Sequence, residues 1–231
     1  MQSDLIRLGL VPLLISFASP ISVRAGDIAL FDWGLLQDGI VTGSGDPLPS
    51  GSTFDESTGL GTVRLEFAGT GAHHGVLFVD HEMSENINTF FNELGSTSVG
   101  APPAGLSWEI DEPGFSRPPG DIFDNFLANT LDNSIGFSRE DDVSMALGWN
   151  FVLAAGETAE VLFQLSETQP SGFYLRQHDP ESGEQVFFSG SLRIFGPSTS
   201  VSDGDVAMPA LALGAFALVA TWRARSARRP C

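Results

Sequence analysis

Apolar and polar side chains alternate along several stretches in the middle of the chain. Val63, Leu65 and Phe67 point to one side of an extended segment, while Arg64 and Glu66 point to the other. Residues 76–79 are apolar on both sides, which is typical of a central strand. Similar runs predict strands at 27–33, 105–110, 143–153, 158–166, 172–177 and 185–195.

Gly, Pro, Asn and Asp separate these runs, and no helical period lies between most of them. Residues 178–184 predict the turn of a hairpin, and residues 42–59 predict a loop. Residues 84–94 and 121–131 predict either short helices or irregular loops. The pattern indicates an all-β fold, with a single β-sandwich or jelly-roll-like domain over residues 26–196.

The N-terminal residues have the three-part pattern of a secretory signal. Arg7 precedes an apolar run from Leu8 to Ala18, and small or β-branched residues stand at Val23 and Ala25. The run is shorter than the ~20 residues that a membrane span requires. We therefore expect a signal peptide over residues 1–25, cleaved after Ala25.

The C-terminal residues predict a membrane anchor. After a linker at 197–205, residues 206–222 carry no charge and are rich in Ala and Leu, at the short limit of a membrane-spanning helix. A basic tail over residues 223–231 should stay on the cytoplasmic side. The residues expected to anchor or sort the chain are Val206, Pro209, Trp222, Arg223, Arg225, Arg228 and Arg229.

Together these ends resemble the PEP-CTERM proteins of Gram-negative bacteria, whose tails carry a Pro-Glu-Pro motif, an apolar helix and an arginine cluster. The aligned stretch here is Val206-Ala207-Met208-Pro209, a degenerate motif that keeps only the second proline. The resemblance implies sorting by an exosortase-type enzyme, with the chain anchored in the inner membrane during sorting and then located at the cell surface or in the extracellular matrix. Because Met208 replaces the glutamate of the motif, the alternative is that the chain is not processed and stays a single-pass membrane protein.

The amino-acid composition of the part expected to be exported limits the kinds of molecule that it can bind. Between Gly26 and Asp205, five arginines stand against 28 carboxylates, a formal charge of −23, and the chain has no lysine. Such a surface repels nucleic acid and favours cations or neutral polysaccharide. The one cysteine, Cys231, cannot form a disulfide within this domain.

Glu109 and Asp111 are the strongest candidates for catalytic residues. On one face of a strand they lie about 6.6 Å apart, within the range of glycosidase carboxylate pairs. The run also resembles part of the Glu-x-Asp-x-x-Glu signature of laminarinase-like glycosidases. Glu112 faces the other way, so the third carboxylate is missing. We expect instead that Trp108 and Ile110 point inward while the acids face solvent.

Acidic residues between positions 111 and 133 suggest a calcium site, because Ca²⁺ takes six to eight oxygen ligands and is often held by loops. Their spacing does not fit an EF-hand. The candidate ligands are Asp111, Glu112, Asp121, Asp124 and Asp132. A transition-metal site at His73, His74 and His81 with Asp80 and Glu82 is not expected, because neighbouring residues of a strand face opposite ways.

Three functions remain open. The first is a non-enzymatic, surface-anchored protein associated with the extracellular polysaccharide matrix. The second is a calcium-dependent carbohydrate-binding module in which Trp108 or Trp149 stacks on sugar, and the third is a glycosidase that uses Glu109 and Asp111. The chain has no nucleophile elbow, phosphate loop or dinucleotide fingerprint, so we expect no enzymatic activity.

Overall fold

The computed structural model describes residues 28–84, 89–114, 120–137 and 139–197. The predicted signal peptide with its cleavage site at Ala25, the linker beyond Pro197, the apolar segment 206–222 and the arginine tail lie outside these residues. Within the described residues, no helix has the length and apolar character needed to cross a membrane.

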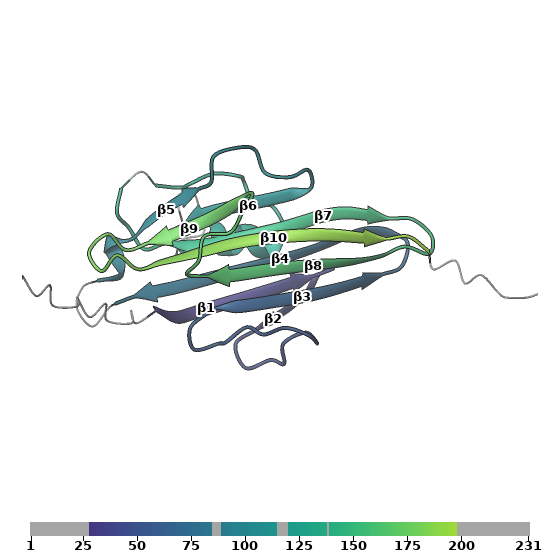
Figure 1. Cartoon of the computed structure of the whole chain (residues 1–231), viewed down its shortest axis with the longest axis horizontal. Helices are drawn as coiled ribbons and strands as arrows, with labels where there is room; N and C mark the ends of the chain where they lie inside the picture. The colour runs from purple at the N-terminus through teal and green to yellow at the C-terminus, as the bar shows by residue number, and fades with distance from the viewer. Residues whose placement is uncertain (1–27, 85–88, 115–119, 138, 198–231) are drawn as a thin grey trace, which may run out of the picture. The chain divides into compact units, whose positions relative to one another are not determined.

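The described residues form two five-stranded sheets, and all strand pairs within them are antiparallel. The first sheet has the order β2-β1-β4-β7-β6 and comprises β1 (Ile28–Gln37), β2 (Ile40–Gly43), β4 (Gly71–Met83), β6 (Leu106–Asp111) and β7 (Ser144–Leu153). The second has the order β3-β8-β10-β9-β5 and comprises β3 (Gly61–Ala68), β5 (Leu94–Thr97), β8 (Thr158–Ser166), β9 (Tyr174–His178) and β10 (Gln185–Phe195). Figure 1 shows the second sheet in front of the first.

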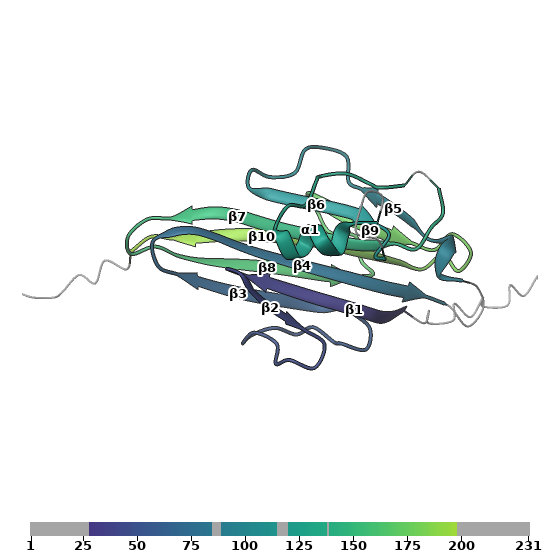
Figure 2. The same ribbon diagram turned by 180° about the vertical axis from the view of Figure 1, so that it is seen from behind.

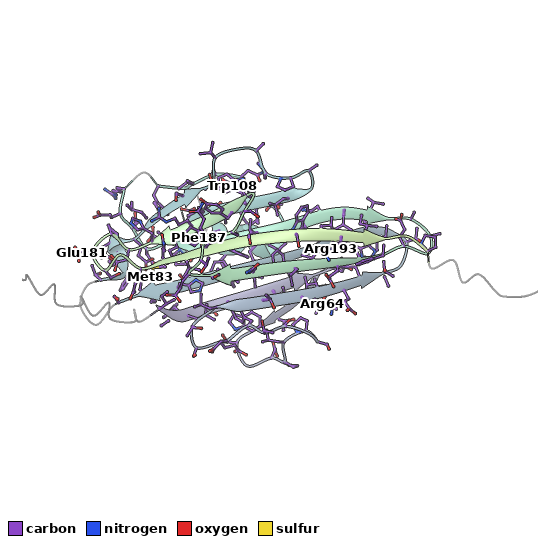
Figure 3. The ribbon with its side chains drawn as sticks, in the orientation of Figure 1. Arg64, Met83, Trp108, Glu181, Phe187 and Arg193 are labelled. Carbon is purple, nitrogen blue, oxygen red and sulfur yellow. The ribbon has the colours of Figure 1, made fainter. Side chains whose placement is uncertain are left out.

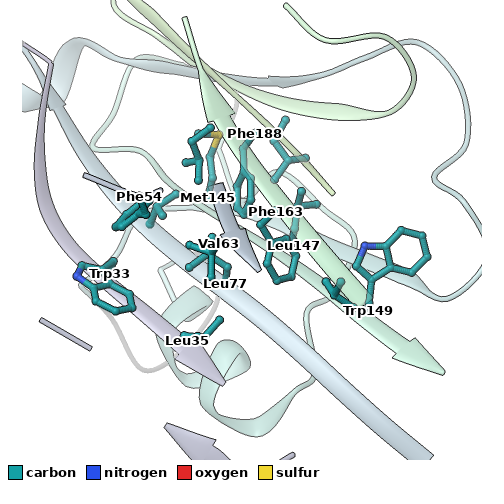
Figure 4. Packing of buried hydrophobic residues seen from close by; sticks show 14 of the residues in the cluster. Trp33, Leu35, Phe54, Val63, Leu77, Met145, Leu147, Trp149, Phe163 and Phe188 are labelled. Carbon is teal, nitrogen blue, oxygen red and sulfur yellow. The ribbon is translucent and has the colours of Figure 1, made fainter. Parts of the chain in front are cut away.

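The two sheets share one apolar core, which makes the fold sandwich-like. Leu77 and Leu147 of the first sheet and Val63, Phe163 and Phe188 of the second belong to this core, and each is fully or almost fully buried (Figure 4). Burying an apolar side chain of this kind contributes roughly 1.5–3 kcal/mol. The alternation of the sequence therefore becomes one inward-facing apolar surface on each sheet.

A helix covers the outer face of the first sheet (Figure 2). Helix α1 (Ile122–Ala128) buries Ile122 and Phe126 in a second, smaller core that includes Val76 and Phe78 of β4. Strand β4 pairs with β1 on one side and β7 on the other. It is thus the central strand, apolar on both faces, that the sequence predicts.

Most predicted strands are confirmed to within a few residues, and the turn at 178–184 joins β9 to β10. Residues 84–94 and 121–131, for which the sequence predicts either short helices or irregular loops, contain the short 3₁₀ helix η1 (Phe90–Asn92) and α1, respectively. Strands β2 and β5 are not predicted, because each has only four residues and neither shows a clear alternation.

Candidate metal centre

Strand β6 carries Glu109 and Asp111 on the face of the first sheet that α1 covers. Only 1% of Glu109 and 2% of Asp111 is exposed, so the expectation that these acids face solvent is wrong. Ile110 does point into the main core, and Trp108 is partly buried against it. The acids are buried because α1 and the segment that follows it lie over this end of β6.

The chain after α1 closes the site by running along the free edge of β6. The backbone N–H of Asn133 donates to the carbonyl of Trp108, and the N–H of Gly136 donates to that of Ile110. The approach at Gly136 is so close that a Cβ there would lie 1.9 Å from Asp111 Oδ1. A residue with a side chain therefore cannot occupy position 136 without displacing the Asp111 carboxylate or the segment.

Asp121, which immediately precedes α1, brings a third carboxylate to the pair on β6. One oxygen from each of Glu109, Asp111 and Asp121 lies within 4.8 Å of the other two. Asp121 makes no capping hydrogen bond from its side chain, and its buried Oδ1 has no hydrogen-bond partner among the described residues. We call these three residues the carboxylate trio.

Amide groups supply most of the hydrogen bonds to the trio. Asp111 accepts bonds from the backbone N–H groups of Gly120 (2.5 Å) and Glu112 (2.9 Å). Glu109 accepts bonds from the side-chain amide of Asn125 on α1 (3.1 and 3.2 Å) and from the backbone N–H of Asp132 (3.2 Å). These donors fix the carboxylate positions without supplying a full positive charge.

Burial makes negative charge costly here. Loss of solvent raises the pKa of Glu109 to about 7, and the charges of Asp132 and Asp121 add to this effect. Burial likewise raises the pKa of Asp111, against the opposing effect of its backbone hydrogen bonds. Among the described residues, no basic side chain forms an ion pair with the trio. Three carboxylates thus converge without a basic side chain to balance their negative charge. A divalent cation that binds through oxygen ligands would supply the balancing positive charge.

Comparison of the chain with protein-family models, with curated protein sequences and with solved structures finds no match. The assignment of the candidate metal centre therefore rests on its geometry alone.

The structure brings together two of the five predicted calcium ligands, Asp111 and Asp121, and adds Glu109, which the sequence suggested only as a catalytic residue. The remaining three lie outside the trio. Glu112 is half-buried and Asp124 is exposed. The exposed Asp132 accepts two hydrogen bonds from Ser134 with its carboxylate and approaches Glu109 only through its backbone N–H.

The histidines do not converge on a metal. His73 bonds to Asp38 (2.8 Å) and to the carbonyl of Gly69. His81 is fully buried, and burial lowers its pKa to about 4. Within the described residues, the trio is the only group of three His, Cys, Asp or Glu side chains with ligand atoms this close together.

The outer face of the second sheet has a groove of about 300 Å³ whose lining carries no charged side chain. Leu162, Pro170 and Phe173 provide apolar surface, and Gln164 and Ser191 are among the residues that provide hydrogen-bonding groups. Trp149, which the sequence suggested as a sugar-stacking residue, is instead buried in the core. Trp108 packs near Phe173, with ring centroids 6.0 Å apart.

Proposed function

We propose that this chain is a non-enzymatic, exported β-sandwich module that binds calcium at the carboxylate trio. In this proposal it is held at the cell surface by its C-terminal segment and associates with the extracellular polysaccharide matrix. The observation that carries the calcium part is the convergence of Glu109, Asp111 and Asp121 within 4.8 Å. Oxygen-only sites of this kind suit Ca²⁺, which also accepts water to complete its six to eight ligands.

A bound calcium ion would connect α1 to the first sheet. Glu109 and Asp111 belong to β6, whereas Asp121 lies at the start of α1. An ion held by all three would tie the helix to the strand and compensate the negative charge buried between them. Because the unfolded chain does not hold these groups together, ion binding would stabilise the folded state.

Thermal unfolding of the full-length chain, in mild detergent, with millimolar calcium and then with a chelator tests this role. A site at ~100 times its dissociation constant adds about 2.7 kcal/mol, a rise in Tm on the order of 5–10 °C. Asp121→Asn should remove the part of the rise that comes from the trio, while Asp124→Asn, a matched change on the exposed face of α1, should preserve the full rise. Equal melting temperatures for the wild type in both buffers would refute the calcium site.

The surface location rests on the ends of the chain, with their secretion pattern, uncharged segment and arginine cluster. An exosortase-type enzyme and the membrane are the partners that this proposal requires. Deleting residues 206–231 should release the protein into the medium. Continued sedimentation of the deletion variant with membranes would overturn the tether.

A calcium-dependent carbohydrate-binding module is the second candidate function. The uncharged groove on the second sheet favours it, because neutral hydroxyl and amide groups beside Phe173 suit a neutral sugar chain. The glycosidase alternative gains no such support. Glu109 and Asp111 are almost fully buried and accept amide hydrogen bonds, whereas a catalytic pair must reach a bound sugar.

A further inference from the structure

A second group of oxygen-bearing side chains lies at the end of β9, well apart in the sequence from the carboxylate trio. It consists of Asn92, Glu93, Gln177 and Asp179, which we call the β9 oxygen cluster. Glu93, Gln177 and Asp179 are fully buried, and Asn92 is 6% exposed. Figure 3 shows Glu181, in the turn after β9, and Met83, at the end of β4, toward the same end of the domain.

Two hydrogen-bonded pairs build the cluster. Gln177 donates through Nε2 to Glu93 Oε2 (2.5 Å) and to the carbonyl of His81 (2.7 Å). Asn92 donates through Nδ2 to Asp179 Oδ1 (3.1 Å). Residues 177 and 179 are separated by two positions, about 6.6 Å along an extended chain, and 92 and 93 are consecutive. Leu94 pairs with His178 in the antiparallel register of β5 and β9, so the two pairs are neighbours.

Each amide in the cluster leaves its oxygen unsatisfied. Gln177 Oε1 and Asn92 Oδ1 are buried and have no hydrogen-bond partner among the described residues. Turning either amide over would place its oxygen against a carboxylate or carbonyl oxygen, so the observed bonds fix its orientation. A buried hydrogen-bond acceptor without a partner lowers the stability of the folded state by roughly 1–3 kcal/mol. A bound ion is one of the groups that can satisfy such an acceptor.

The chemistry of the cluster specifies the class of ion. Two carboxylates and two amide oxygens form a set of hard ligands with two formal negative charges, and nitrogen or sulfur ligands are not part of it. Glu93 forms no ion pair with any described basic residue. We propose that the β9 oxygen cluster binds a divalent cation of the calcium class through Glu93, Asp179, Asn92 Oδ1 and Gln177 Oε1.

The proposed ligands lie in or beside β5 and β9 of the second sheet, and hydrogen bonds of Glu93 and Gln177 connect them to the end of β4 in the first sheet. Gln177 belongs to β9 of the second sheet, and Asp179 begins the turn to β10, where the backbone N–H of Glu181 also donates to its Oδ1. Glu93 accepts a bond from the backbone N–H of Met83 at the end of β4 in the first sheet. The β9 oxygen cluster thus lies in a different part of the fold from the carboxylate trio, which would connect a helix to one sheet. Ion binding by the cluster does not depend on ion binding by the trio.

Equilibrium dialysis of the full-length chain against radioactive calcium distinguishes the two sites. The wild type should bind two ions, Asp121→Asn one, Glu93→Gln one, and the double variant none. Glu181→Gln, an exposed change in the same turn, should still bind two. Circular dichroism checks that each variant is folded.

Unchanged binding by Glu93→Gln, or a single wild-type ion that Asp121→Asn removes, would overturn the β9 site and leave the trio intact. Loss of one ion in Glu93→Gln but none in Asp121→Asn would support the β9 site and refute the trio. No bound ion in the wild type would refute both sites.

Asn92→Asp provides a second test that does not need Glu93→Gln to fold. It adds a carboxylate at the unsatisfied amide, and because ligand charge tunes calcium affinity, it should tighten one of the two sites by at least about tenfold. Unchanged affinity at both sites would count against the proposal.

Discussion

Asp111 and Asp80 are both buried aspartates of the first sheet, but their surroundings differ. Two backbone N–H groups bond to Asp111, and the carboxylates beside it converge toward a single point. Asp80 accepts one hydrogen bond, from Ser144 Oγ (2.9 Å), and the charges around it come from Asp142 and Asp32. A cation can satisfy several converging carboxylates at once, whereas an acid surrounded by dispersed like charges is most simply neutralised by a proton.

The pKa values follow this difference. Burial, followed by the charge of Asp142, raises the pKa of Asp80 to about 7. Burial raises the pKa of Glu93 to about 9, with Glu82 the largest of the neighbouring charges. For Asp111, hydrogen bonds from backbone N–H groups oppose the rise. Backbone N–H donors thus lower the cost of charge on Asp111, whereas for Asp80 only the hydrogen bond from Ser144 opposes the rise.

The largest expected effect is a pH dependence of stability to which Asp80 contributes together with Glu93 and Glu109, whose pKa values are also raised. In the unfolded chain Asp80 titrates near pH 4, so between about pH 4 and 7 only the folded chain holds its proton. The free energy of unfolding should fall as pH rises through this window, by up to about 4 kcal/mol for about three pKa units. Urea unfolding at pH 4.5, 6 and 8 in chelator measures this slope.

Asp80→Asn should reduce the slope by the contribution of Asp80, because an amide is neutral at every pH in the window, while Glu109 and Glu93 retain their contributions. Asp124→Asn, at an exposed position, should leave the slope as in the wild type. If the Asp80→Asn slope equals that of the wild type, Asp80 does not hold a proton in the folded state and the contrast with Asp111 fails.

A smaller effect should follow from crowding the trio. Gly136→Ala places a Cβ against Asp111 Oδ1, so either the Asp111 carboxylate or the segment along β6 must move, and the carboxylate geometry changes. We expect a loss of about 2–3 kcal/mol in the free energy of unfolding and a weaker response to calcium. The pH slope assigned to Asp80 should remain unchanged.

Gly114→Ala is the matched control, because a Cβ at that exposed position meets nothing within 4 Å. It should change the free energy of unfolding by less than about 0.5 kcal/mol. Wild-type stability and calcium response in Gly136→Ala would show that the close approach does not constrain the trio.

The strands could be predicted from the sequence where alternation was long. Residues 158–166 and 185–195 are β8 and β10 with the predicted bounds, because their apolar positions repeat every second residue against one core. Strand β5 was missed because it pairs with β9, which is distant in the sequence, and its own residues do not indicate that pairing. Strand β2 instead forms a hairpin with the adjacent β1 through Asp38 and Gly39, and its four residues are too short to show alternation.

The candidate site could be predicted only in part, for a similar reason. The acidic run suggested calcium, and Asp111 and Asp121 were included, but nothing local shows that α1 folds over β6 and buries Glu109. Gln177 offered a weak signal, as an amide in a strand where Leu175 also faces the core. Its pairing with Glu93 depends on contacts between segments more than 80 positions apart.

A crystal structure of the protein grown with calcium would show directly whether the carboxylate trio holds an ion. We expect an anomalous scattering peak between Glu109, Asp111 and Asp121, with carboxylate oxygens at about 2.3–2.6 Å from the ion. The same three side chains in the same positions, with water or nothing between them at millimolar calcium, would contradict it.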